Sequence, residues 1–246
     1  MSVLILIDHS DGHIKKASLE ALSYGAAVAE QLGTTAEGLV MGSPTEDIAA
    51  LGQYGVTKIH QVQSDSLAQF DAQVYTKAIA EVAESTGAKV IIFSNNSFGK
   101  SIAPRLSVRL KAGLVAGAVG LPNTTAGFVV KKSVFSGKAF AHVSVNTDVK
   151  IISLNVNAYQ VANKGAATAE VVPFNATVDA PKVKVTGNTK TTGSVNLTEA
   201  ETVVSAGRGL KGPENWGMVE ELAQVLGAGL ACSRPVADAH WRPHNE

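Results

Sequence analysis

A glycine loop with an arginine inside it is the segment of this chain best suited to hold a charged ligand. Gly207, Gly209 and Gly212 form a G-x-G-x-x-G, and Pro213 follows where the first turn of a helix accepts proline. Glycines let the backbone turn tightly and approach a phosphate, and free amides at a helix start attract negative charge. Arg208 adds a fixed cation for a pyrophosphate. A tight turn with a surface arginine remains the alternative.

A second arginine follows the next predicted strand. The strand Gly229–Cys232 runs into Ser233 and Arg234, where a nicotinamide-binding fold carries an acid for the ribose. An arginine at that position, together with Arg208 in the loop, disfavours a nicotinamide dehydrogenase. On the residue pattern alone, Arg234 either reaches into a ligand crevice or is an ordinary solvated arginine.

Weaker candidates lie elsewhere. Asp8 and His9 follow the first predicted strand, and the amide and hydroxyl cluster 94–97 follows another, so both are candidate ligand loops. His240 and His244 have the spacing H-x-x-x-H, but the intervening Pro243 interrupts the helix that would align them, and we expect no metal site. The sequence contains no H-E-x-x-H, G-x-S-x-G or Walker motif, and no paired carboxylates suited to acid–base catalysis. The sequence therefore predicts no catalytic site.

The elements around these loops alternate between strand and helix in the N-terminal half. Short apolar runs predict buried strands, and apolar residues at helical spacing between them predict amphipathic helices. This alternation indicates an α/β fold with a doubly wound parallel sheet. The predicted strands are Val3–Ile7, Gly38–Met41, Val56–Val62 and Val90–Phe93, and the predicted helices include Asp47–Leu51, Phe70–Ser85 and Ile102–Leu110.

The pattern changes after residue 127. Alternating runs at Phe128–Lys132, Ala139–Val145 and Lys150–Val156 predict antiparallel or edge strands appended to the sheet. A polar glycine- and threonine-rich stretch then indicates a linker. After it, one β-α-β unit follows: strand Thr202–Ser205, helix Glu214–Leu226 and the strand before Ser233. We expect an N-terminal domain over 1–188, a linker over 189–196, and the start of a second domain over 197–246.

Composition excludes several classes of protein. The 246 residues are 45% hydrophobic and carry 21 basic and 21 acidic side chains, for a formal net charge of +0. A balanced charge argues against binding nucleic acid or a membrane surface through bulk positive potential. One cysteine, Cys232, excludes a disulfide framework and points to a reducing cytosol. No apolar run has the length of a membrane span, so the chain is expected not to insert into a membrane.

With these features in place, the sequence resembles the alpha subunit of electron transfer flavoprotein along its whole length. The resemblance rests on four well-spaced segments in order: GKSIAPRLSVRLKAGLVAGAVGL at Gly99–Leu121, SVFSGKAFAHV at Ser133–Val143, VVSAGRGLKGPENW at Val203–Trp216 and SRPVADAHW at Ser233–Trp241. It implies an N-terminal domain of the adenine-nucleotide-hydrolase-like type and a Rossmann-like FAD-binding domain that begins with the β-α-β unit.

The resemblance also implies a role. The family's alpha subunit pairs with a beta subunit, and the FAD of the heterodimer carries electrons from acyl-CoA and other dehydrogenases to a quinone oxidoreductase or another acceptor. Such a protein is an electron carrier without a substrate of its own, here expected in the bacterial cytoplasm. The implied FAD-binding residues are Arg208, Gly209, Ser233 and Arg234, with Arg208 near the phosphate–adenosine part and Arg234 over the isoalloxazine.

One departure from the family bears on the cofactor. Family members continue with a Q-T-G segment and an S-G-A-I-Q-H segment that complete the flavin site, and this sequence ends at Glu246, before both. We therefore expect the chain to carry an incomplete FAD site and to hold FAD weakly or not at all when alone. The alternative function is a stand-alone module that binds adenine nucleotides near Asp8 and Ser94, or another protein.

Overall fold

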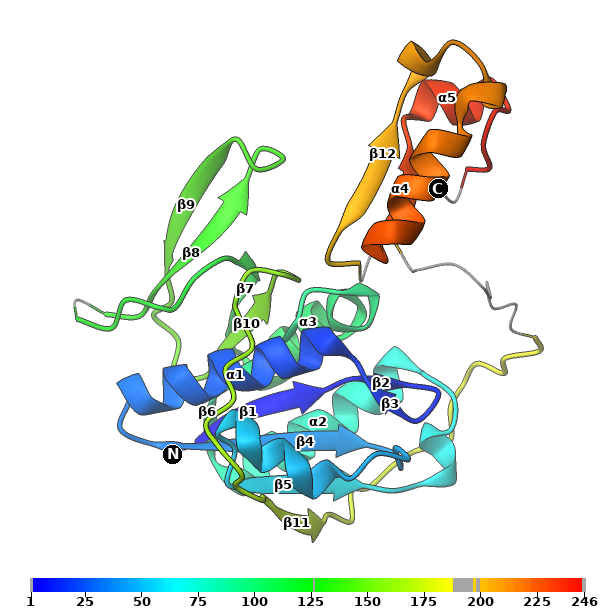
Figure 1. The fold of residues 1–246 in the computed structure, drawn as a ribbon. Coiled ribbons are helices and arrows are strands. Elements are labelled where there is room, and N and C mark those ends of the chain that lie inside the picture. The colour runs from blue at the N-terminus through cyan, green and yellow to red at the C-terminus, as the bar shows by residue number, and fades with distance from the viewer. Residues whose placement is uncertain (1, 126, 188–196, 198–199, 245–246) are drawn as a thin grey trace. The chain divides into compact units, whose positions relative to one another are not determined.

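The chain forms two compact units. The computed structural model describes residues 2–125, 127–187, 197 and 200–244 (Figure 1). The first unit is Met1–Val185 and the second is Thr186–Glu246. The linker expected over 189–196 lies outside the described residues. Each unit has its own apolar core, so each is described by itself.

A nine-stranded sheet organises the first unit, in the order β11-β5-β4-β1-β6-β10-β7-β8-β9. Every strand from β11 to β7 runs parallel to its neighbour, whereas β8 and β9 are antiparallel. The strands are β1 (Ser2–Ile7), β4 (Thr35–Met41), β5 (Lys58–Val62), β6 (Ala88–Ser94), β7 (Gly113–Ala118), β8 (Val129–Val134), β9 (Ala139–Ser144), β10 (Lys150–Leu154) and β11 (Glu170–Pro173).

Helices cover both faces of this sheet, as the alternation of strands and helices predicted (Figure 1). Helix α1 (Lys16–Gln31) packs with Val3, Ile5 and Ile7 of β1, while α2 (Ala72–Thr86) and α3 (Ser97–Leu110) pack with Leu4 and Leu6. Successive strand residues point to opposite faces, which explains why β1 is a continuous apolar run. The fold is therefore a doubly wound parallel α/β sheet. Short elements complete it: β2 (His9–Ser10), β3 (His13–Ile14), η1 (Ile48–Tyr54) and η2 (Asp65–Leu67).

The predicted loop after β6 is shorter than the sequence indicated. Strand β6 reaches Ser94, and α3 begins at Ser97 rather than at Ile102. The Asn96 side chain accepts a hydrogen bond from the Gly99 amide at 2.9 Å and caps the helix. A Cβ on Gly99 would lie 2.0 Å from the backbone oxygen of Ser94, so the turn from strand to helix is tight enough to require glycine.

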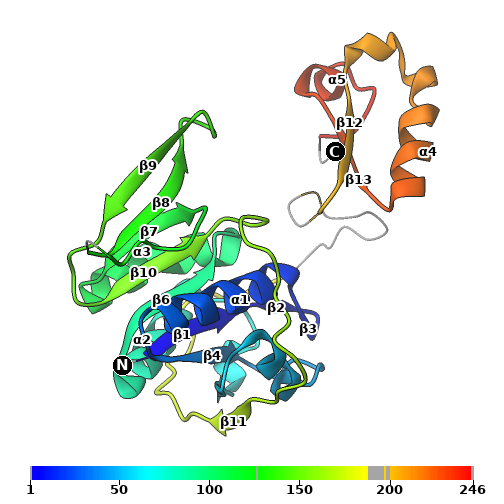
Figure 2. The same ribbon diagram turned by 60° about the vertical axis from the view of Figure 1, so that its left-hand side comes forward.

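The segment from residue 128 to 156 both confirms and corrects the sequence prediction. Strands β8 and β9 form the expected antiparallel hairpin at the edge of the sheet (Figure 2). The expectation for Lys150–Val156 is wrong, because β10 lies between β6 and β7 and runs parallel to both. A serine is usually expected at an exposed position of a strand. Ser153 is nevertheless buried, and its hydroxyl donates to the Asn95 side-chain oxygen at 2.8 Å. Strand β7 was not predicted, because Gly113–Ala118 contains only two bulky apolar residues.

The second unit is a single β-α-β arrangement. Strands β12 (Val203–Ala206) and β13 (Gly229–Cys232) are parallel neighbours, as expected, and α4 (Gly217–Leu226) connects them (Figure 2). Two 3-10 turns, η3 (Arg208–Leu210) and η4 (Pro213–Asn215), precede α4, and a short helix α5 (Arg234–Asp238) follows β13. The core is small and gathers around Trp216, Val219 and Val236.

Candidate cofactor site

The two arginine-bearing segments of the second unit meet at the carboxyl edge of its sheet. The register pairs Ala206 with Cys232, the last residues of the two strands. The Ser233 amide donates to the Ala206 carbonyl at 3.0 Å, and a Cβ on Gly207 would lie 3.4 Å from the Ser233 hydroxyl. The crevice outside the carboxyl ends of parallel strands is where open α/β sheets bind ligands.

Arg208 opens the turn η3 directly after β12. It is exposed, and the described residues offer it no hydrogen bond or ion pair. Its guanidinium is therefore a cation without an internal partner, two residues beyond the end of the strand. Gly209 beside it is also exposed, and a Cβ there would meet no atom within 4 Å.

Arg234 opens α5, two residues beyond the end of β13. Its side chain is 91% exposed, and its Nε lies 3.6 Å from Asp238 Oδ2, one turn further along the helix. An exposed pair of this kind contributes little to stability. The two arginines thus hold equivalent places after neighbouring strands, and neither is needed to hold the unit together.

The glycine loop differs from its expected conformation. Gly207 and Gly212 have extended backbones, with φ of −130° and −174°, and the left-handed residue of the loop is Lys211, with φ of 69°. Helix α4 begins at Gly217 rather than at Glu214, because η4 intervenes. None of the three glycines has the left-handed φ that favours glycine, and the long helix does not start directly at the loop.

Three residues that the sequence pattern did not single out support this loop. Trp216 is 2% exposed, and its Nε1 has no hydrogen-bond partner within the described part of the chain. The Arg242 guanidinium lies 5.6 Å from the Trp216 ring centroid and 2.6 Å from Glu220 Oε1. This cation–aromatic stack ties the chain after α5 to the start of α4. A tryptophan just after a glycine loop was the signal available in the sequence.

The histidine pair does not gather ligands. His240 has φ of 58° just after α5, so the helix that would align it with His244 ends before it. Over the described ranges, no group of three or more His, Cys, Asp or Glu side chains could hold a metal ion.

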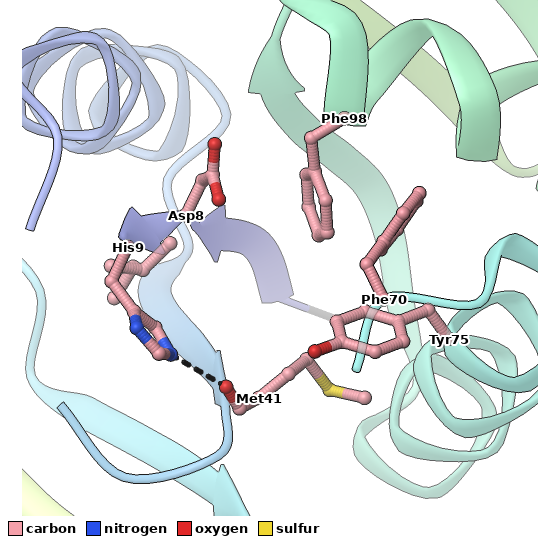
Figure 3. Close-up of a pocket in the computed structure, with 7 residues that line it drawn as sticks. Asp8, His9, Met41, Phe70, Tyr75 and Phe98 are labelled. Carbon is pink, nitrogen blue, oxygen red and sulfur yellow. Dashed lines mark hydrogen bonds between the residues drawn. The ribbon is translucent and has the colours of Figure 1, made fainter. Parts of the chain in front are cut away.

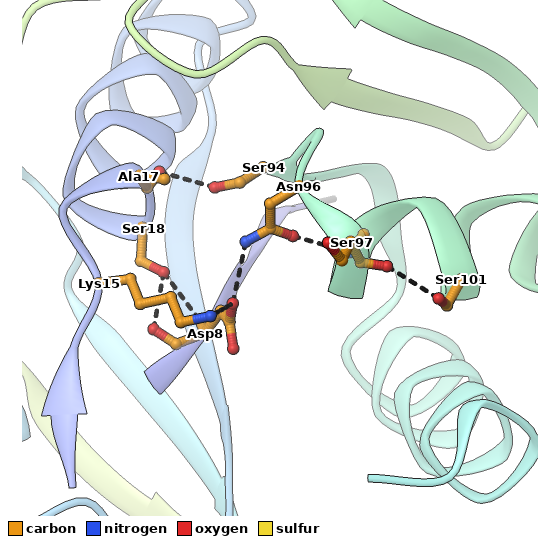
Figure 4. A network of polar contacts seen from close by, with 9 residues as sticks. Asp8, Lys15, Ala17, Ser18, Ser94, Asn96, Ser97 and Ser101 are labelled. Carbon is orange, nitrogen blue, oxygen red and sulfur yellow. Dashed lines mark hydrogen bonds and ion pairs between the residues drawn. The ribbon is translucent and has the colours of Figure 1, made fainter. Parts of the chain in front are cut away.

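The polar residues of the first unit form an internal network (Figure 4). Asp8 Oδ2 lies 3.1 Å from Lys15 Nζ and accepts a hydrogen bond from Asn96 Nδ2 at 2.9 Å. The Ser18 hydroxyl bonds to both the amide and the carbonyl of Asp8, and Ser94 donates to the Ala17 carbonyl at 2.7 Å. Because these groups bond to one another across β1, α1 and β6, the structure gives no support to a nucleotide-phosphate site there.

Known protein families match both units. The electron transfer flavoprotein domain matches residues 3–179, and the electron transfer flavoprotein FAD-binding domain matches residues 196–246. The chain belongs to the alpha-subunit family of electron transfer flavoproteins. Its relatives include the electron transfer flavoprotein subunit alpha of Syntrophomonas wolfei, with 30% identity over 98% of this chain and 75% of that protein. That of Bacillus subtilis has 29% identity over 97% of this chain and 74% of the relative.

A third relative has a different name. The lactate dehydrogenase (NAD(+),ferredoxin) subunit LctC of Acetobacterium woodii is 26% identical over 97% of this chain and 59% of that protein. Relatives of this chain are thus named both as electron transfer flavoprotein subunits and as a subunit of a dehydrogenase.

The described residues of this electron transfer flavoprotein chain fit one side of an FAD site. The FAD-binding domain match spans the glycine loop and both arginines. FAD carries an anionic pyrophosphate, and Arg208, which has no hydrogen-bond or ion-pair partner among the described residues, lies next to a glycine whose Cβ position is open. Among the helices that the structure describes, none combines the length and the apolar character needed to cross a membrane.

Proposed function

We propose that this chain is the alpha subunit of a heterodimeric electron carrier that holds FAD together with an electron transfer flavoprotein beta subunit. Electrons would come from acyl-CoA and other dehydrogenases, as in fatty acid β-oxidation, and pass to a quinone oxidoreductase or another acceptor. The chain would work in the bacterial cytoplasm and catalyse no reaction on a substrate of its own. The observation that carries this proposal is the pair of exposed arginines after two neighbouring strands of a family-matched FAD-binding domain.

Each candidate residue has a proposed task in binding FAD. FAD, when bound, supplies the one- and two-electron chemistry. Arg208 and the Gly209 backbone would bind the phosphate–adenosine part, because the guanidinium can donate two parallel hydrogen bonds to phosphate oxygens. Ser233 and Arg234 would lie beside the isoalloxazine, where a cation favours added negative charge on the ring.

Asp238 would reduce the positive charge that Arg234 presents to the ring. Its carboxylate lies within 3.6 Å of Arg234 Nε, so the arginine does not act as an isolated cation. The Arg234 side chain is 91% exposed, so it could turn away from Asp238 and bind an anionic group of the cofactor.

The four residues supply one side of the proposed site. Within its described residues the second unit has a two-stranded sheet, and α4 leaves Met218, Leu222, Val225 and Leu226 exposed. Two strands and two helices form a small core, and a two-stranded sheet is of marginal stability. We therefore expect the chain alone to bind FAD weakly, and a submicromolar Kd for the chain alone would contradict this.

The experiment that tests the function is co-expression with the beta subunit of the same organism. We expect the two chains to purify together with bound flavin, which is measured by absorbance, and the flavin to be reduced by an acyl-CoA dehydrogenase and its substrate. A stable heterodimer without flavin would refute the proposed cofactor role. A flavin that binds but is not reduced by any dehydrogenase of that organism would refute the electron-carrier role.

A further inference from the structure

A small cavity at the carboxyl edge of the large sheet takes no part in the proposed FAD site. It has a volume of about 90 Å³ and belongs to the first unit (Figure 3). One wall comes from the ends of β1 and β4, and the opposite wall is aromatic. Its lining includes Asp8, His9, Met41, Phe70, Tyr75 and Phe98.

The Asp8 carboxylate supplies the charge in this cavity. Its side chain is 12% exposed, and Lys15 and Asn96 both contact the same oxygen, Oδ2. Within the described residues, Oδ1 receives no hydrogen bond or ion pair. Because an ionised carboxylate has about four acceptor positions, Asp8 retains acceptor capacity toward a ligand.

Three aromatic rings form the facing wall. The ring centroids of Phe70 and Tyr75 are 5.1 Å apart, those of Phe70 and Phe98 are 5.0 Å apart, and those of Tyr75 and Phe98 are 5.6 Å apart. The electron-rich face of such a ring attracts a cation. Phe70 is 44% exposed, so one ring of the three is open to solvent.

The remaining polar groups of the lining favour a donor as the ligand. His9 lies 2.7 Å from the Met41 carbonyl through Nε2, and a carbonyl only accepts, so Nε2 carries the proton and Nδ1 of the neutral ring is an acceptor. The Tyr75 hydroxyl donates to the Leu67 carbonyl at 3.0 Å. Burial raises the pKa of Tyr75, and the nearby Asp8 carboxylate raises it further.

We propose that this cavity binds a primary ammonium group, with the positive head between Asp8 and the aromatic wall and its alkyl part against Phe70 and Phe98. The cavity is smaller than the roughly 150 Å³ that holds a benzene molecule, so the alkyl chain of the ligand must be short. Lys15 partly compensates the charge of Asp8, so we expect millimolar rather than micromolar affinity. Both a small free amine and a lysine side chain of another protein carry this group.

The chain contains a built-in reporter for the test. Of its three methionines, Met41 lines the cavity and Met218 lies on α4 of the second unit. With methionine methyl groups labelled with ¹³C, we expect propylammonium to shift the Met41 signal saturably and to leave the Met218 signal in place. The neutral isostere 1-propanol should bind at least about tenfold more weakly, because it lacks the charge.

Matched variants locate the binding. Asp8→Asn should weaken propylammonium binding at least about tenfold, and Phe70→Leu by about threefold. Asp148→Asn, which removes an exposed acid outside the cavity, should change nothing. Equal binding of 1-propanol and propylammonium to the unmodified chain would overturn the proposal without any variant. So would an Asp8→Asn protein that keeps its Met218 and Met41 signals and its affinity.

A second titration distinguishes the two sources of the ammonium group. If Nα-acetyl-lysine amide binds as tightly as propylammonium, the ligand is a lysine side chain presented by another protein. If only propylammonium binds, the ligand is a small free amine. If neither shifts the Met41 signal, the proposal is wrong. None of these results depends on FAD, so they leave the proposed electron-carrier function untouched.

Discussion

Replacing Arg208 with alanine isolates one interaction with FAD. The side chain is exposed and has no hydrogen bond or ion pair within the described residues, so its removal breaks no contact that holds the second unit together. Any loss of affinity then reports on the ligand. Riboflavin is the informative second ligand, because it carries the isoalloxazine without the phosphates.

The magnitude follows from the bonds that a guanidinium makes to a phosphate. A hydrogen bond to a charged group contributes about 1.5–3 kcal/mol. At about 1.4 kcal/mol per factor of ten, Arg208→Ala should weaken FAD binding about 10- to 150-fold. Riboflavin binding should change less than about twofold, since no phosphate bond is lost. Arg234→Ala should weaken both ligands, because that arginine is proposed to lie beside the ring.

Equilibrium dialysis of the heterodimer against each ligand measures these factors. The matched control is Lys211→Asn, which removes a cation from the same loop and keeps a residue that tolerates the φ of 69° at that position. The reasoning is refuted if Lys211→Asn lowers FAD affinity as much as Arg208→Ala does. It is also refuted if Arg208→Ala weakens riboflavin and FAD by the same factor.

Three further predictions concern the stability of the first unit. Tyr24→Phe removes a buried hydroxyl that donates to the Gly120 carbonyl at 3.0 Å, and should cost about 1 kcal/mol at pH 7 in urea unfolding. Burial raises the pKa of Tyr24 in the folded state, so its contribution is complete below the unfolded pKa of about 10 and is lost as pH rises above it. The cost of Tyr24→Phe should therefore shrink at alkaline pH, and a cost independent of pH up to 11 would contradict the assigned burial effect. Gly99→Ala should cost about 1–3 kcal/mol, because the new Cβ meets the Ser94 backbone oxygen rather than a movable side chain; an unchanged urea midpoint would show that the turn can open. Asp71→Ala should cost about 1 kcal/mol through loss of the cap of α2, whereas Asp71→Asn should cost only a few tenths, and equal losses would argue against capping.

The sequence predicted the parallel core of the first unit well where burial is complete. The run Val3–Ile7 is apolar at every position because both faces of β1 are covered, and this signal needs no knowledge of the neighbours. The helix predicted over Phe70–Ser85 is observed as α2 (Ala72–Thr86), and Gly87 ends it with a left-handed φ of 65°.

Predictions failed where a neighbour changes the meaning of a residue. Ser153 looks like an exposed position of an edge strand, yet it lies in the middle of the sheet. It can be buried there because the Asn95 side chain accepts a hydrogen bond from its hydroxyl. Phe98 and Gly99 look like loop residues, yet the Asn96 side chain caps a helix that contains them. Such contacts are made by residues whose types alone indicate turns.

The sequence by itself determined the family, the strand–helix alternation of the N-terminal half, and the loop that carries Arg208. These depend on local patterns and on short segments in a set order. Only the tertiary structure decided that Ala206 pairs with Cys232, that β10 is central, and that Asp8 faces three aromatic rings across a cavity (Figure 3). Strand pairing and cavities join residues that are far apart in the chain, so their energies come from packing that no local segment encodes.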